Sequence, residues 1–297
     1  MLGQMAINGL LIGGVYGLAA LGLSLIWGVM GVVNIAHGAF IMLGAYVSYW
    51  MFMLFGLHPF LSVIIALVLG MGTGLIIYRF LIDRIIVKAA SELEMELMTL
   101  LLTFGLSIVL YGSVLIAWGA DLRGIPILLP TWSIGNLAIP TSRLSAFGGA
   151  LFLGGILYIF LKRTYLGKAI RAVAQSRNTA MLSAINPVKI FVVSFGIGLA
   201  YAMISGVMVS LILPVTPALW EQYLLKSFTV VVLGGLGNPM GAFVGGLVLG
   251  LAESFTVLFA SYAWSPAIAF FLLILILIIR PTGIFGAVRL VGPLRRI

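Results

Sequence analysis

The sequence contains no cysteine and very little charge. Of its 297 residues, 8% are charged and 63% are apolar, whereas soluble domains carry about 25% charged residues. So few charged side chains could not cover the surface of a soluble globule of this size, which excludes a cytosolic enzyme. The absence of cysteine excludes disulfides, thiolate metal sites and cysteine nucleophiles. The chain is therefore expected to be an integral membrane protein.

Long apolar runs fill most of the chain. A hydrocarbon core of about 30 Å requires about 20 apolar residues per helical crossing. Eight runs approach this length: 5–28, 35–56, 60–80, 97–118, 144–161, 189–213, 240–260 and 264–280. A ninth run, 226–236, is short and leads into Gly-Gly-Leu-Gly-Asn-Pro at 234–239, which is typical of a helix that ends inside protein. The sequence predicts a single all-α domain over 1–297, with about eight transmembrane helices plus a short broken half-helix.

The basic residues are concentrated in three segments. One holds Arg79, Arg84 and Lys88, the second spans 162–189 with six Lys and Arg, and the third holds Arg280, Arg289, Arg295 and Arg296. Positive residues mark cytoplasmic loops, so we expect an external N-terminus and a cytoplasmic C-terminus, with Arg123, Arg143 and Lys226 outside. This topology closes only if 226–236 completes a crossing with its neighbouring loop. Because the cations lie in short loops rather than on a solvated domain, they predict contact with membrane lipid and not with nucleic acid.

The segment 162–189, termed the coupling segment below, is patterned rather than a simple loop. It combines a basic start, a helical stretch with apolar Ala169, Ile170 and Val173, and a second apolar turn that ends at Asn186 and Pro187. Short amphipathic helices of this kind can insert into a groove of a soluble partner. The alternative is a loop held at the membrane interface by its basic residues.

The coupling segment resembles that of the permease subunits of branched-chain amino acid ABC transporters. In that family a Gly-x-x-x-Arg-Ala stretch precedes an Ala-x-x-x-Gly-Ile-Asn ending. The matching residues here are Gly167, Arg171, Ala172, Ala180, Ile185 and Asn186. Residues 17–46 and 233–253 are similar to two further motifs of the family, in the same order. Two departures are Ala184, where the family favours Gly, and 177–182, which lacks the acidic residue often found there.

The resemblance implies one permease subunit of an ATP-driven importer of branched-chain or other hydrophobic amino acids, similar to the shorter, LivH-type permease. It implies a bacterial or archaeal plasma membrane, a second permease subunit, two cytoplasmic ATP-binding subunits and an external substrate-binding protein as partners. Relatives that carry urea or short amides are the alternative within the family. The residues expected to couple to the ATP-binding subunits are Gly167, Lys168, Arg171, Ala172, Gln175, Ala180, Ile185 and Asn186.

Polar residues inside the apolar runs are the candidates for a translocation pathway or gate. Asn34, His37 and Gly38 lie where the first two crossings meet, and Asn238 adjoins the broken half-helix. For Asn34 and His37 the alternative is ordinary hydrogen bonding at a helix break. Thr99, Thr103 and Ser107 form a hydroxyl stripe at a spacing of four, which is either a mildly polar wall or a set of hydroxyls bonded to the preceding turn.

Glu253 is the one acid well inside an apolar run. Ionisable groups at such depth usually face protein or water and often mark a pathway. Glu253 could instead pair with Lys226, or be held neutral by burial. Proton or ion coupling at Glu253 would make the chain a stand-alone secondary transporter, which is the alternative function. No phosphate-binding loop, metal-ligand cluster, paired carboxylates or nucleophile with a base is present in the sequence, so we expect no catalytic residue, metal or cofactor.

Overall fold

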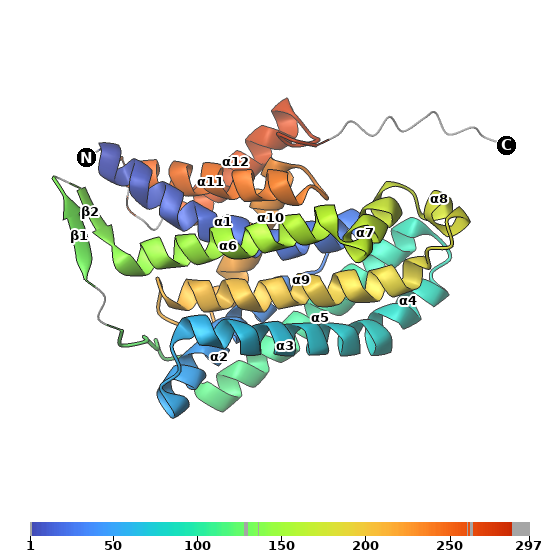
Figure 1. Ribbon diagram of the computed structural model, residues 1–297, viewed down its shortest axis with the longest axis horizontal. Helices are drawn as coiled ribbons and strands as arrows, with labels where there is room; N and C mark the ends of the chain where they lie inside the picture. The colour runs from blue at the N-terminus through green and yellow to red at the C-terminus, as the bar shows by residue number, and fades with distance from the viewer. Residues whose placement is uncertain (1, 128–129, 136, 260, 262–263, 287–297) are drawn as a thin grey trace.

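The computed structural model describes residues 2–127, 130–135, 137–259, 261 and 264–286, and it is a bundle of long helices (Figure 1). Within these ranges seven helices are long and apolar enough to cross a membrane. They are α1 (Leu2–Met30), α2 (His37–Phe55), α3 (Pro59–Ile77) with its continuations η1 (Tyr78–Ile82) and α4 (Asp83–Lys88), α5 (Glu92–Trp118), α6 (Thr141–Arg163), α9 (Pro187–Ser210) and α11 (Pro239–Thr256). The prediction of an all-α polytopic membrane protein is confirmed.

Shorter elements connect and complete the bundle. They are α7 (Tyr165–Gln175), α8 (Arg177–Leu182), α10 (Leu219–Gly234), α12 (Ser265–Ile279) and the antiparallel strands β1 (Thr131–Ile134) and β2 (Leu137–Pro140). The hairpin of β1 and β2 lies at one end of the bundle and α7 and α8 lie at the other (Figure 1). We call these the hairpin end and the coupling end. Gln4 of α1 bonds the backbone of Ala138 in both directions, at 2.7 and 2.8 Å, which fixes the start of α1 at the hairpin end.

Helix α1 is the centre of the bundle, and small residues let other helices approach it closely. Gly13 faces α11, where an added Cβ would lie 2.8 Å from the carbonyl oxygen of Gly246. Gly9 faces Leu251 and Gly17 faces Phe243, so α1 and α11 are antiparallel. Close helix packing of this kind needs small residues at the contact. The glycine spacing in the sequence therefore reports packing, as the commoner interpretation of such a spacing predicts.

Several boundaries differ from the expected ones. The segment with Arg79, Arg84 and Lys88 is helical, because η1 and α4 continue α3 without a break. The short run at 226–236 belongs to α10, which begins seven residues earlier at Leu219 and ends at Gly234; Glu221 and Gln222 in its first turns hid this start from a reading of apolar runs. The eighth expected crossing, α12, has 15 residues, about 22 Å at 1.5 Å per residue. Arg289, Arg295 and Arg296 lie outside the described residues.

Candidate functional site

The coupling segment folds into two short helices because each begins at a side-chain cap. The Thr164 hydroxyl accepts from the backbone N–H of Gly167 at 3.0 Å and starts α7. Ser176 accepts from Thr179 N–H at 3.3 Å and starts α8. Asn186 accepts from Val188 N–H at 3.0 Å and starts α9. Ser, Thr and Asn are favoured at this position because their side-chain oxygen satisfies a free N–H of the first turn. The local sequence therefore determines where α7 and α8 begin, and we call these two helices together the elbow.

The structure divides the predicted coupling residues into two groups. Lys168, Arg171, Gln175 and Asn186 are exposed at the coupling end, whereas Gly167 and Ala180 are buried and Ala172 and Ile185 are partly buried. Gly167 packs against the last turn of α6, where an added Cβ would lie 2.6 Å from the Cα of Leu161. The buried group thus shapes the elbow and the exposed group is available to a partner.

Two exposed apolar residues were missed by the sequence analysis. The side chains of Met181 and Leu182 in α8 are 52% and 89% exposed. A helix of six residues is too short for its periodicity to reveal which face is buried, so no signal in the sequence distinguishes these residues from core residues. Isolated exposed apolar residues are normal, whereas this adjacent pair lies among basic residues and is a candidate for contact with a partner.

Arg177 was also missed as a site residue, although the sequence carries a signal for it. Its guanidinium donates to the carbonyl oxygen of Met30, the last residue of α1, at 2.6 Å, and lies 5.1 Å from the ring of Phe191. A cation is unfavourable in the first turn of α8 but favourable at the C-terminus of α1. An Arg directly after an N-cap serine therefore indicates a distant partner. This contact joins the elbow to the central helix.

The first two crossings are joined by a non-helical return at 31–36, in which Val32, Asn34 and Ala36 are buried. The ring nitrogen Nε2 of His37 lies 2.7 Å from the carbonyl oxygen of Ala19, and Ala19 lies about three turns before the end of α1. The chain therefore runs back along α1 before α2 begins, inside the bundle. Irregular backbone at membrane depth is tolerated only where it is buried in protein or lines a cavity.

Asn34 lies in this return with its amide unsatisfied. The residue is 1% exposed, and neither Oδ1 nor Nδ2 has a hydrogen-bond partner among the residues that the structure describes. The ordinary hydrogen bonding expected at this break is present at Nε2 of His37 and at the backbone carbonyl of Asn34, which accepts from His37 N–H at 3.3 Å, but it does not extend to the Asn34 side chain. A buried amide without partners costs about 1–3 kcal/mol, so the Asn34 side chain raises the free energy of this conformation.

The hydroxyl stripe of α5 contacts the same return. The Thr103 hydroxyl accepts from the backbone N–H of Ile35 at 3.1 Å and donates to the carbonyl oxygen of Thr99 at 2.9 Å. Thr99 and Ser107 donate to carbonyl oxygens of the preceding turn at 2.7 and 2.6 Å. All three hydroxyl residues are buried, so bonding to the preceding turn is confirmed, and only Thr103 also reaches another segment.

Gly38 lies where α2 meets α10. An added Cβ there would lie 2.7 Å from Cβ of Leu224, so α10 approaches α2 closely at its start. Asn238, by contrast, lies away from this return, at the N-terminus of α11. Its Oδ1 accepts from Gly241 N–H at 3.1 Å and its Nδ2 donates to the Phe285 carbonyl oxygen at 3.1 Å. The structure therefore brings together Asn34, His37, Gly38 and Thr103, but not Asn238.

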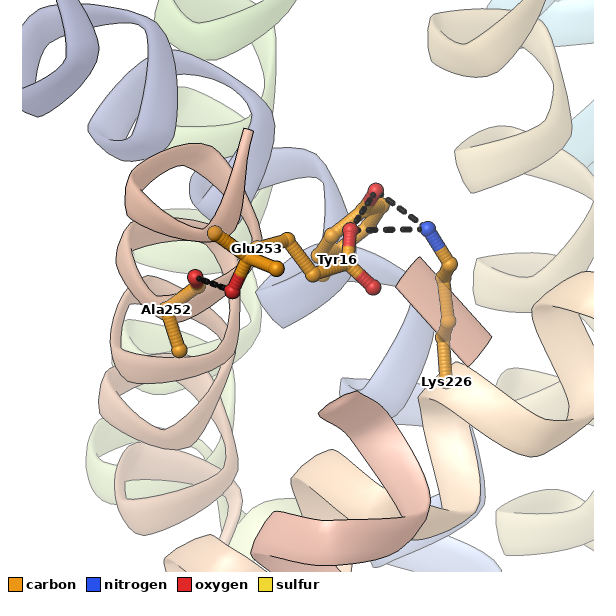
Figure 2. Close-up of polar contacts among 5 residues, drawn as sticks. Tyr16, Lys226, Ala252 and Glu253 are labelled. Carbon is orange, nitrogen blue, oxygen red and sulfur yellow. Dashed lines mark hydrogen bonds and ion pairs between the residues drawn. The ribbon is translucent and has the colours of Figure 1, made fainter. Parts of the chain in front are cut away.

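Glu253 forms a buried ion pair with Lys226, one of the alternatives raised by the sequence. Figure 2 shows the two residues meeting beside Tyr16, with one residue from each of α11, α10 and α1. The ammonium of Lys226 lies 2.9 Å from Oε2 of Glu253 and donates to the Tyr16 hydroxyl at 2.5 Å, and that hydroxyl donates to the same Oε2 at 2.7 Å. The side chains of Lys226 and Glu253 are 9% and 5% exposed.

This pair changes the interpretation of both residues. Lys226 was expected on the external side, at the start of a short half-helix, but the residue lies in the middle of α10 and is buried. A charge so buried needs a partner, and the carboxylate 27 positions later supplies it. Through these contacts Glu253, Lys226 and Tyr16 tie α11, α10 and α1 together.

The chain is similar to the high-affinity branched-chain amino acid transport system permease protein BraD of Pseudomonas aeruginosa, at 31% identity over 95% of each chain. It is 30% identical to the corresponding permease protein LivH of Escherichia coli K12, again over 95% of each chain. The solved PsaBC complex of Streptococcus pneumoniae with Fab matches with a TM-score of 0.49 at 15% identity, over 94% of this chain and 93% of that one. The family described as branched-chain amino acid transport system, permease component, matches residues 5–277, and the chain belongs to this family.

Proposed function

We propose that this chain forms one half of the translocation pathway of an ATP-driven importer of branched-chain or other hydrophobic amino acids. As a permease subunit it leaves ATP hydrolysis to partner subunits and works within a transporter complex. The proposed partners are a second permease subunit, two cytoplasmic ATP-binding subunits and an external substrate-binding protein.

The observation that carries the proposal is the elbow at the coupling end. Its exposed surface combines Lys168, Arg171 and Gln175 with the apolar pair Met181 and Leu182. A short helix that presents apolar anchors within a polar rim is a common way to dock into a groove of a soluble protein. Arg177 connects this surface to the end of α1, so movement of a docked ATP-binding subunit would reach the centre of the bundle.

The proposed pathway runs beside the return at 31–36. The unsatisfied amide of Asn34 can donate and accept hydrogen bonds, which suits a zwitterionic substrate in an otherwise apolar passage. The positive end of the α2 dipole begins three residues further on, at His37, and broken transmembrane helices use such ends to meet anionic groups of substrates. The return would then bind weakly and release, as a transport site must.

The proposed orientation places the coupling end in the cytoplasm and the hairpin end outside. The chain has no native cysteine, so Ser183→Cys and Ser133→Cys each add a single thiol, at exposed positions of the two ends. In intact cells a membrane-impermeant maleimide should label the variant at 133 and spare the one at 183. The reverse labelling would overturn the orientation and the coupling role together.

The coupling role is tested by Leu182→Asp. A carboxylate in place of this exposed anchor should leave the permease folded, because Leu182 makes little contact inside the chain, and should reduce both co-purification of ATP-binding subunits and ATP-driven leucine uptake in proteoliposomes by at least about tenfold. Ser183→Asp adds the same charge one residue away without removing an apolar side chain and serves as the control. Uptake at the wild-type rate by Leu182→Asp, or uptake by the purified chain without ATP, would contradict the proposal.

A further inference from the structure

An apolar groove runs along the outside of the bundle toward the coupling end, separate from the return at 31–36. It has a volume of about 430 Å³ and lies between α1, α6, α7 and α11. Leu151, Leu157 and Phe243 line it, and Gly154 and Gly155 on α6 leave the space open. The neighbouring outer face of α6 exposes Phe152 and Ile159 by 69% and 60%. In a crossing helix such a face meets hydrocarbon.

The polar groups of this groove lie together at its coupling end. Lys162, in the last turn of α6, and Arg171, on α7, lie there with Asn238. The Lys162 ammonium lies 3.2 Å from the Tyr158 hydroxyl and 5.4 Å from the centre of that ring. Among the side chains that the structure describes, ion pairs occur at Arg79–Asp83 and Lys226–Glu253. No carboxylate of this part of the chain therefore neutralises Lys162 or Arg171.

We propose that the groove binds one anionic phospholipid of the surrounding bilayer. An acyl chain would occupy the space beside Gly154 and Gly155, and the phosphate would lie between Lys162 and Arg171. The groove requires an amphiphile with an acyl chain and an anionic headgroup, because its walls are apolar and both cations lie at one end. Basic pockets between transmembrane helices on the cytoplasmic side recognise lipid head groups by this combination.

A headgroup at this place would connect the end of α6 to α7. Arg171 belongs to the exposed face of α7, and Lys162 precedes the Thr164 cap by two residues. A phosphate held by both would join the end of α6 to α7 without any direct contact between the two side chains. The lipid composition of the membrane would then influence how firmly α7 is held against the bundle.

The proposal is tested with the assembled transporter, delipidated in detergent and titrated with phosphatidylglycerol or phosphatidylcholine of equal chain length while bound lipid is counted by native mass spectrometry. The wild-type protein should retain one phosphatidylglycerol per permease in preference to phosphatidylcholine. Lys162→Gln should weaken phosphatidylglycerol binding about fivefold and leave phosphatidylcholine unchanged, and Lys162→Arg should restore the preference.

Two glycine variants distinguish binding of the acyl chain in the groove from binding of the phosphate by the two cations. A Cβ at Gly155 meets no atom within 4 Å, so Gly155→Leu fills the groove without a backbone clash and should reduce retention of both lipids. Gly148, also on α6, has the same open surroundings but does not line the groove, so Gly148→Leu should behave as wild type. A thermal unfolding midpoint near that of wild type confirms that each variant is folded.

Four results would overturn the proposal. The first is equal retention of the two lipids by the wild-type protein, and the second is full retention of phosphatidylglycerol by Gly155→Leu. The third is displacement of the bound anion by inorganic phosphate at the lipid's own concentration, which would identify a free-anion site. The fourth is release of the second permease, instead of lipid, by Gly155→Leu, which would make the groove a subunit interface.

Discussion

Two helix breaks in this chain have similar sequences and opposite hydrogen bonding. Each follows a helix that runs toward the coupling end, α1 or α10, and each places an Asn shortly before Gly-Ala-Phe at the start of the next helix. At Asn238 both amide atoms have partners, one in its own helix and one at Phe285. At Asn34, which is 1% exposed, neither amide atom has a partner in the described part of the chain.

The difference separates a structural break from one that is available for function. A capped break such as 235–238 is satisfied within the chain and keeps its shape. A buried amide without partners raises the free energy of the folded state, and a role in function is one of the reasons for which such a group is retained. We therefore expect the break at 31–36 to gain its missing hydrogen bonds during transport, while the break at 235–238 stays fixed.

The largest expected effect concerns the buried pair Lys226–Glu253, which joins the two helices on either side of the break at 235–238. Lys226→Met should lower the free energy of unfolding by about 3–5 kcal/mol, because it leaves the buried carboxylate of Glu253 without its partner. The measurement is thermal unfolding of the purified permease in detergent. Lys226→Met combined with Glu253→Gln should recover much of the loss, since no buried charge then remains. If Lys226→Met left stability unchanged while Glu253→Gln abolished transport, Glu253 would act in transport as a proton carrier and not as a structural partner of Lys226.

A smaller change in energy but a direct effect on transport is expected at the other break. Asn34→Leu replaces the amide with an apolar side chain of similar size, so stability should be unchanged or raised by up to about 2 kcal/mol. Uptake of labelled leucine by the assembled transporter should nevertheless fall by at least about tenfold. The measurement is initial uptake at equal amounts of folded protein.

The same variant can contradict the comparison between the breaks. If Asn34→Leu lowered the unfolding midpoint, the amide would have a partner in the resting protein and would be a structural group like Asn238. Thr103→Val serves as a matched control, because it removes a hydroxyl that already has partners, at Ile35 and Thr99. It should reduce stability more than Asn34→Leu does.

Asn238→Ala is expected to act on stability alone. It removes the cap of α11 and the contact to Phe285, which should cost about 1 kcal/mol. Uptake should then fall only in proportion to the amount of folded protein, as measured by size-exclusion chromatography beside the uptake assay. If uptake were lost while stability was unchanged, Asn238 would be assigned to the translocation pathway.

The sequence was sufficient for features that depend on local chemistry. Apolar runs located the long helices, and the caps at Thr164, Ser176 and Asn186 follow from residue types favoured at helix starts. Contacts between distant segments could not be predicted in the same way. Nothing near Asn34 in the sequence reveals that its amide is unpaired, and the pairing of Lys226 with Glu253 depends on how α10 and α11 pack.

The smallest expected effect is at Ala184, directly after α8, where the strain is in the backbone and not in a side chain. Ala184 has φ 58°, a left-handed conformation that costs a residue with a Cβ about 1–2 kcal/mol and that Gly, the residue expected here from the resemblance, adopts freely. Ala184→Gly removes that cost from the folded state. Glycine also increases the conformational entropy of the unfolded chain, which lowers stability by about 0.4–1 kcal/mol, so the unfolding midpoint should rise only slightly. Because the elbow keeps its shape, uptake should stay at the wild-type rate, whereas Ala184→Val, with a branched side chain at the same φ, should lower the midpoint. A fall in uptake with Ala184→Gly would mean that strain at the elbow, and not only the unpaired amide of Asn34, takes part in coupling.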